Sequence, residues 1–309
     1  MTMTWLDPVR EEFRKRLLGD RLAHAFLLSG QTGTGKQGLA MEMAAAILCR
    51  EYRLPACGSC RSCQLLVSGA HPDFRILSFE LNRNGKLRTE IVIDQVRELI
   101  SFLQLTTTIG EKKAALVYPA EAMNKNAANA LLKTLEEPPG DAVIILLSHD
   151  PFRLAVTITS RCQKLQVRSP DTDTALAWLL ESGAYGDAEA RSALKAAAGS
   201  PIRARDMLSE GGPDHYRLVS DTLESMLEGR CAPARAMSAL GDVEPGRLWT
   251  WLSLSAADRF RHNMENHTVT SSLSHLQNLA DRNRALLSSP VRKDLLLQDW
   301  LIQWARLDA

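Results

Sequence analysis

The sequence predicts an α/β fold with a parallel sheet in its first half and helices alone after it. Short β-rich apolar runs alternate with stretches of helical periodicity up to about residue 167. A glycine-rich turn follows the first run, and no strand pattern occurs beyond the last one. Alternation of this kind is typical of parallel strands joined by helices that cover both faces of the sheet.

The expected elements can be placed in chain order. Four apolar runs are predicted to be strands and a fifth is weaker: "AHAFLLS" (23–29), "FRILS" (74–78), "AALVYP" (114–119), "AVIILLS" (142–148) and "QKLQV" (163–167). Helices are expected at 37–49, 93–104 and 124–137, and Pro138-Pro139-Gly140 ends the last of them. Each of these helices therefore lies between two expected strands.

The composition changes near residue 168, where "RSPDTD" is predicted to be a linker. Short helices rich in Ala and Leu follow, and "SEGGPD" (209–214) is a second break. We therefore expect three domains, an α/β domain at 1–167, a small helical domain at 168–208 and a helical domain at 209–309.

The last helical segment carries one apolar stripe, formed by Leu296, Leu297, Trp300, Leu301 and Trp304. Burial of this stripe against partner helices and burial in a core of the same chain are both open.

Charge and hydrophobicity exclude some classes of function. The chain has 37 Lys and Arg and 36 Asp and Glu, so that it has no strong overall field for nucleic acid or an anionic membrane. The longest apolar run, 142–147, is far shorter than the ~20 residues of a membrane-spanning helix. Acidic and basic side chains occur too early for a secretory signal, and we expect a cytoplasmic protein. Clustered cysteines in a reducing compartment point to metal.

A phosphate-binding loop is predicted between the first strand and the first long helix. The segment "GQTGTGK" matches G-x-x-x-x-G-K from Gly30 to Lys36. Gly30, Gly33 and Gly35 would let the backbone turn tightly and point N–H groups at phosphate oxygens. Lys36 would reach the terminal phosphates, and the start of the helix adds positive potential. A glycine-rich turn that never binds nucleotide is the simpler alternative, but the complete motif in this position favours descent from a phosphate loop.

Three groups that ATP hydrolysis requires are missing from the sequence. Hydrolysis needs magnesium, held by a loop hydroxyl and by an acidic residue at the end of a later strand. Gln37 stands where the loop normally has Ser or Thr, and Tyr118 and Pro119 stand where the strand would end in Asp-Glu. Glu121 is the nearest carboxylate, and we expect it to lie past the strand end. We therefore expect no useful ATP hydrolysis, whereas nucleotide or phosphate binding stays open.

Four cysteines are predicted to bind a structural zinc ion. Cys49, Cys57, Cys60 and Cys63 are spaced C-x7-C-x2-C-x2-C, and four thiolates can surround zinc tetrahedrally. Free thiols, a redox pair and a knuckle that binds nucleic acid are the alternatives, but three cysteines in seven residues favour metal. The ion would hold an insertion at 49–63 that has few apolar residues for a core of its own.

Several stretches occur together and in order, and they carry a resemblance to a known family: "AHAFLLSGQTGTGK", the cysteine array, "GAHPDF", "NAANALLKTLEEPP", "TITSRCQKL" and "GSPIRA". The chain resembles the bacterial clamp-loader subunits of DNA polymerase III, which belong to the AAA+ superfamily. The resemblance covers residues 5–208 closely and the C-terminal third only by its helical character. It implies that the small helical domain is a lid and that the last domain belongs to a collar that holds the subunits together.

This family contains motor subunits, with a complete phosphate loop and an Asp-Glu strand end, and a stationary type that lacks some of these groups. Gln37, Tyr118 and Pro119 place the chain with the stationary type. The resemblance then implies a role for Arg161 in "SRC", which would point across a subunit boundary at the γ-phosphate of ATP held by a neighbour. The chain itself would not be an enzyme.

The same resemblance assigns further positions and partners. Ser148 matches the first sensor at the end of the fourth strand and Arg203 the second sensor, although either can be a relic in a chain without hydrolysis. Glu136 and Glu137 of "LEEPP" are interpreted as solvent-facing or helix-end residues rather than catalytic ones. The implied partners are the motor subunits (gamma/tau) and the clamp-opening delta subunit. The sliding clamp and primer-template DNA would be reached through the complex.

Two other functions are open. An active ATPase motor (gamma/tau-like) would require Gln37 and Glu121 to hold magnesium. A zinc-dependent nucleic-acid binder on an old NTPase fold would require concentrated Lys and Arg, which the charge balance does not favour.

Overall fold

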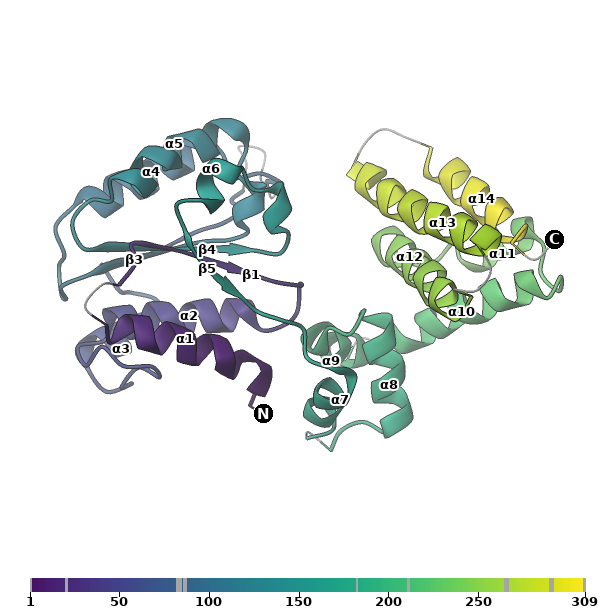
Figure 1. Ribbon diagram of the computed structural model, residues 1–309, viewed down its shortest axis with the longest axis horizontal. Helices are drawn as coiled ribbons and strands as arrows, with labels where there is room; N and C mark the ends of the chain where they lie inside the picture. Colours follow the sequence, from purple (N-terminus) through teal and green to yellow (C-terminus); the bar gives the residue numbers. More distant parts are fainter. Residues whose placement is uncertain are drawn as a thin grey trace. The chain divides into compact units, whose positions relative to one another are not determined.

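The predicted parallel sheet is confirmed in the computed structural model, which describes residues 2–19, 22–81, 85, 88–181, 183–209, 212–263, 267–288 and 292–307 (Figure 1). Its strands are β1 (Ala25–Ser29), β2 (Phe74–Leu77), β3 (Lys113–Val117), β4 (Ala142–Ser148) and β5 (Gln163–Gln166). They lie in the order β2-β3-β4-β1-β5, and every pair is parallel. All five apolar runs therefore form strands.

Helices cover both faces of this sheet (Figure 1). One face carries α1 (Asp7–Leu17), α2 (Lys36–Leu48) and α3 (Arg61–Val67), and the other carries α4 (Ile93–Gln104), α5 (Lys125–Glu136) and α6 (Val156–Thr159). The elements η1 (Thr4–Leu6), η2 (Ala120–Ala122), η3 (Pro151–Arg153) and α7 (Thr172–Leu180) complete this part. The helices α2, α4 and α5 agree with the predicted ranges to within one residue.

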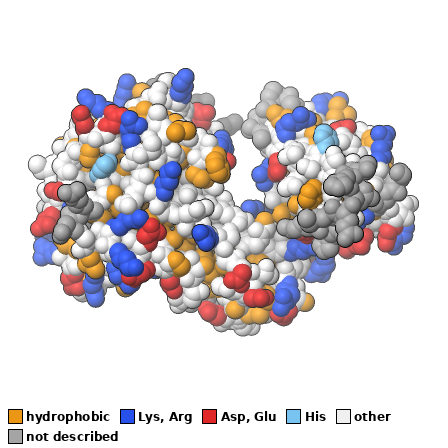
Figure 2. Space-filling model, in the orientation of Figure 1, with side chains coloured by type: hydrophobic (Ala, Val, Ile, Leu, Met, Phe, Trp, Pro, Cys, Tyr) orange, Lys and Arg blue, Asp and Glu red, His pale blue; other side chains and the backbone are white. Residues whose placement is uncertain are grey.

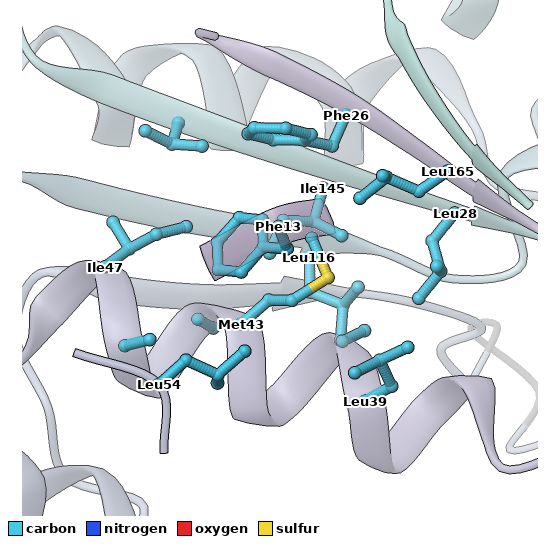
Figure 3. Close-up of a cluster of buried hydrophobic side chains, with 14 of the residues drawn as sticks. Phe13, Phe26, Leu28, Leu39, Met43, Ile47, Leu54, Leu116, Ile145 and Leu165 are labelled. Atoms are coloured by element: carbon cyan, nitrogen blue, oxygen red, sulfur yellow. The ribbon is translucent and has the colours of Figure 1, made fainter. Parts of the chain in front are cut away.

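Alternate residues of each strand point to opposite faces, so that the sheet has two cores. The core between the sheet and α1 and α2 includes Phe13, Phe26, Leu28, Met43, Leu116 and Ile145 (Figure 3). The core on the other face includes Leu27, Leu99, Val117, Leu131, Ile144 and Leu146. Because both faces are buried, the central strands are almost continuously apolar in sequence, as is usual for parallel sheets.

The chain divides into two compact units. The first consists of Met1–Glu181 and Ser200–Ile202, and the second consists of Ser182–Gly199 and Arg203–Ala309. The predicted division into three domains at 168 and 209 stays a prediction. No helix in the described ranges combines the length and apolar character needed to cross a membrane.

All regular elements described beyond residue 167 are helices, as expected. After α7 they are α8 (Asp187–Ala196), α9 (Pro201–Ser209), α10 (Gly212–Leu227), α11 (Pro233–Ala239), α12 (Pro245–His262), α13 (His267–Ala285), η4 (Leu286–Ser288) and α14 (Lys293–Trp304).

Tryptophan side chains organise the core of the second unit. The indole N–H groups of Trp251, Trp300 and Trp304 donate to backbone oxygens at 2.9–3.0 Å. Trp300 and Trp304 are stacked, with ring centroids 5.2 Å apart, and both are buried. The innermost part of the predicted stripe is therefore an intrachain core, while Leu296 and Leu297 are only half-buried.

Candidate functional site

The predicted phosphate loop joins β1 to α2, and close contacts fix its shape. A Cβ atom on Gly30 would lie 2.2 Å from the Val167 oxygen, and one on Gly35 would lie 2.5 Å from Sδ of Met3. Gly35 also has φ of +89°, a conformation that favours glycine. The Trp5 indole N–H donates to the Thr34 oxygen at 2.8 Å. The loop is thus held from the side of η1 and requires glycine at both positions.

Lys36 is turned toward its own loop. It is 2% exposed, and its Nζ donates a hydrogen bond to the Gln31 oxygen at 2.5 Å. The Thr34 hydroxyl donates to the same oxygen at 2.9 Å. Burial lowers the pKa of Lys36 to about 8, and the negative charge of Glu121 opposes this shift only in part. The cation that would reach terminal phosphates is therefore enclosed.

Three side chains from the carboxyl ends of β3 and β4 lie opposite the loop. The backbone N–H of His149 donates to the carboxylate of Glu121 at 3.0 Å. The rings of Tyr118 and His149 meet edge to face, with centroids 5.5 Å apart. Burial and the charge of Lys36 lower the pKa of His149, so that its imidazole is neutral at pH 7. Tyr118 and His149 line a cavity of about 420 Å³ together with Gly33, Gly35, Lys36 and Gln37.

This cavity lacks the usual magnesium ligands among the described residues. Gln37 is exposed, and Tyr118 presents a phenol where a carboxylate is normal. Glu121 lies beyond the strand end, as expected, but it is not remote, because it approaches both Lys36 and His149. One carboxylate oxygen of Glu121, the Ser148 hydroxyl and Nδ1 of His149 are buried without a hydrogen-bond partner in the described part of the chain. Such atoms are uncommon, and of the three residues only His149 lines the cavity itself.

His149 is the residue of this cavity that sequence reasoning missed. Its signal was its position directly after Ser148, at the carboxyl end of a buried strand where functional groups of α/β sheets gather. Ser148 does lie at the end of β4, paired in register with Ser29 of β1. Its sensor role stays a prediction.

Arg161 follows α6 and precedes β5, and its side chain is 34% exposed. The guanidinium forms an ion pair with Glu136 and donates to the Thr157 oxygen at 2.8 Å. The next residue, Cys162, is buried, which raises the pKa of its thiol to about 12. Arg161 is thus a cation on the surface, and the buried side chain of Cys162 next to it holds the segment in place.

Arg203 belongs to the second compact unit and is half-buried. Burial lowers the pKa of its guanidinium, and the charges of Arg284 and Arg247 lower it further. The second-sensor role of Arg203 stays a prediction.

The four predicted metal ligands come together. The Sγ atoms of Cys49, Cys57, Cys60 and Cys63 all lie within 4.8 Å of one another. The Sγ atoms of Cys57 and Cys63 are 3.9 Å apart, close to the ~3.8 Å that a tetrahedron with Zn–S bonds of about 2.3 Å requires. The backbone N–H groups of Cys57, Cys60 and Cys63 each donate to the sulfur of another cysteine of the group at 3.4–3.5 Å. These four residues can hold a metal ion.

A buried polar network connects the cysteine insertion to the sheet and explains the "GAHPDF" motif. The Ser62 hydroxyl donates to the Leu48 oxygen at 2.7 Å and lies 2.8 Å from Nε2 of His71. Nδ1 of His71 accepts the Asp73 N–H at 3.0 Å, which leaves the proton on Nε2 of the neutral ring. The carboxylate of Asp73 in turn accepts hydrogen bonds from two backbone N–H groups and from Lys113 of β3.

Comparison with known proteins identifies the family. A family model described as "DNA polymerase III, delta subunit" matches residues 6–171. The DNA polymerase III subunit delta' of Pseudomonas aeruginosa is 37% identical to the chain over 287 residues, which are 91% of this chain and 84% of that protein. The chain belongs to the delta-prime family of DNA polymerase III subunits. The resemblance carried by the sequence motifs is thereby confirmed.

Relatives named as tau or gamma subunits match less of the chain. The DNA polymerase III subunit tau/gamma of Haemophilus influenzae is 33% identical over 156 residues, only 50% of this chain and 22% of that protein. Among solved structures, a gamma subunit-related protein of Thermotoga maritima covers 99% of this chain and 100% of its own, with 16% identity and a TM-score of 0.51. At that identity the likeness concerns the fold alone.

The enclosure of Lys36 generates a testable expectation. In the folded chain its ammonium should titrate near pH 8, because burial disfavours the charged form. The pKa of an exposed lysine is about 10.4. The folded state then binds fewer protons than the unfolded state between these values, so that the free energy of unfolding should rise with pH across this window. NMR titration of the lysine side-chain signals, with Lys36→Met to assign the resonance, measures the midpoint. A midpoint shared with the other lysines would contradict the buried position.

Proposed function

We propose that the chain is the stationary, non-hydrolysing subunit of the DNA polymerase III clamp loader. In this role it supports ATP-driven loading of the sliding clamp onto primed DNA and supplies Arg161 in trans to ATP held by a neighbouring subunit. The observation that carries the proposal is the carboxyl end of β3, where Tyr118 and Pro119 follow Val117 instead of an acidic pair.

The geometry around Lys36 gives the physical reason for the absence of hydrolysis. Catalysis of phosphoryl transfer depends almost entirely on positioning and on neutralisation of charge by magnesium. Magnesium takes hard oxygen ligands in near-ideal octahedral geometry. The Gln37 amide does not replace the loop hydroxyl, and the Tyr118 phenol does not replace the carboxylate at the strand end. Glu121 accepts the His149 N–H and lies near Lys36, but it stands past the end of β3 and not at the position of the missing acidic pair. The alternative of an active motor has no observation in its favour at these positions.

The surface position of Arg161 supports its proposed role in trans. It lies on the surface between β4 and β5, outside the cavity beside Lys36. The same segment exposes two apolar side chains, Phe152 at 96% and Val156 at 79%. Exposed apolar side chains beside a charged group fit a surface that another protein covers. A guanidinium delivered to a neighbouring γ-phosphate stabilises charge in the transition state and raises hydrolysis by about 10³–10⁵-fold.

The proposed partners are the motor subunits of the gamma/tau type and the clamp-opening delta subunit. The sliding clamp and primer-template DNA are contacted within the complex, and the helices of the second unit join a collar. Positive and negative side chains are interspersed over the visible face in Figure 2, so that this face offers no concentrated basic field for DNA. The protein is proposed to act in the cytoplasm.

We further propose that the metal of the cysteine cluster is zinc in a structural role. Four thiolate ligands leave no position open for chemistry, and N–H donors around the sulfurs stabilise thiolates. The ion would connect the end of α2 at Cys49 with the start of α3 at Cys60 and thereby fix the insertion.

Replacement of Arg161 by Ala tests the role in trans. We expect a folded chain, because the side chain is on the surface, but ATP turnover by the reconstituted complex should fall. The loss should equal the part of the total turnover that comes from the one ATP site facing Arg161. The measurement is the steady-state release of phosphate with clamp and primed DNA present.

Arg153→Ala is the matched control, because Arg153 is an exposed cation eight residues away on the same segment. Normal turnover with Arg161→Ala, or an equal loss with the control, would remove the proposed role.

Metal analysis tests the cysteine site. Protein purified without chelator should contain about one zinc ion per chain, and Cys57→Ser with Cys60→Ser should contain none. Loss of the ion should expose the insertion to protease, because the site contributes on the order of 10 kcal/mol to local folding. Protein that lacks zinc and still resists cleavage at 49–63 would contradict the assignment.

A further inference from the structure

The ion pair between Glu136 and Arg161 connects two motifs that the proposed function leaves separate. Glu136 is the last residue of α5 in "LEEPP", and its side chain is 48% exposed. Arg161 belongs to "SRC" and is 34% exposed. Besides Glu136, the guanidinium contacts the Thr157 oxygen and the Ser160 hydroxyl.

The two charged groups are held at a fixed spacing by buried neighbours. Leu135, next to Glu136, and Ile158, next to Thr157, are buried in the same core. The helices α5 and α6 pack against each other, and Pro138 and Pro139 follow the end of α5. The backbone positions of α5 and α6 therefore bring the carboxylate and the guanidinium within reach of each other.

We propose that Glu136 is a positioning residue that restrains Arg161 and neutralises its charge until nucleotide in the neighbouring subunit draws the guanidinium away. This inference rests on the proposed function of Arg161. The carboxylate and the γ-phosphate are both anions, and they compete for the same cation. While the neighbouring site is distant, the pair with Glu136 holds the guanidinium against α5. When the triphosphate approaches, its larger negative charge displaces the carboxylate.

The strength of the pair sets the size of the effect. Exposed ion pairs contribute little, about 1 kcal/mol at most, because solvent screens them. Such a pair keeps Arg161 in place without trapping it. Removal of the pair should therefore raise the rate of hydrolysis at the neighbouring ATP site by no more than about fivefold. This factor corresponds to a free energy of about 1 kcal/mol. The effect should fall on kcat more than on KM, because the guanidinium acts most strongly on charge that develops in the transition state.

The experiment uses the clamp loader reconstituted with variants of the full chain. Glu136→Gln keeps the shape of the side chain and removes its charge. We expect hydrolysis at the ATP site that faces Arg161 to rise about two- to fivefold, and kcat of the complex to rise in proportion to the share of that site. Glu137→Gln is the matched control, because Glu137 is exposed and has no ion pair among the described residues. In a chain that also carries Arg161→Ala, Glu136→Gln should have no effect, whereas a purely structural role would persist there.

If Glu136→Gln leaves kcat unchanged or lowers it, while Arg161→Ala still reduces ATP turnover by the complex, this inference alone is overturned. Normal turnover with Arg161→Ala would remove the proposed role in trans and this inference with it. Thermal unfolding of each variant serves as the check that the chain is folded.

Discussion

Magnesium requires hard oxygen ligands at fixed positions, and the carboxyl end of β3 does not supply them. The rest of the site follows from this constraint. Without an acidic pair, the Tyr118 ring packs edge to face on His149, and Glu121 accepts the His149 N–H. Lys36 is left with the Gln31 oxygen and the charge of Glu121 as its compensation. The loop keeps the backbone of a phosphate site, but its lysine is enclosed and donates to a backbone oxygen of the same loop.

In the proposed function, the group that acts on ATP is Arg161 on the surface of the chain, and the sheet supports the segment that carries it. Two cores fix the strands from both faces, so that the segment between β4 and β5 presents Arg161 from a rigid base. The cysteine cluster lies on the other face, between α2 and α3, and the network of Ser62, His71 and Asp73 anchors it to β2 and β3. Both features support the sheet and its insertion, in line with the stationary role proposed above.

The sequence allowed the fold to be predicted well, because parallel strands buried on both faces are nearly unbroken apolar runs. The cysteine cluster was predictable from spacing alone, since C-x2-C steps confine sulfurs to a small volume. The pairing of Glu136 with Arg161 was not, because the two residues are 25 positions apart and meet only through the packing of α5 on α6. Likewise, Glu121 was expected beyond the strand end, but its approach to Lys36 depends on η2, which turns it back toward β4. Trp300 and Trp304 formed an apolar stripe whose partner, inside or outside the chain, only the fold could decide.

The central claim is that the chain cannot cleave ATP itself. Phosphate release by the isolated, zinc-loaded chain with ATP and excess magnesium, with and without primed DNA, tests it most directly. We expect release no faster than from ATP in buffer, because no carboxylate at the end of β3 fixes the metal. Phosphate release at a rate comparable with that of a motor subunit, abolished by Lys36→Met, would contradict the account.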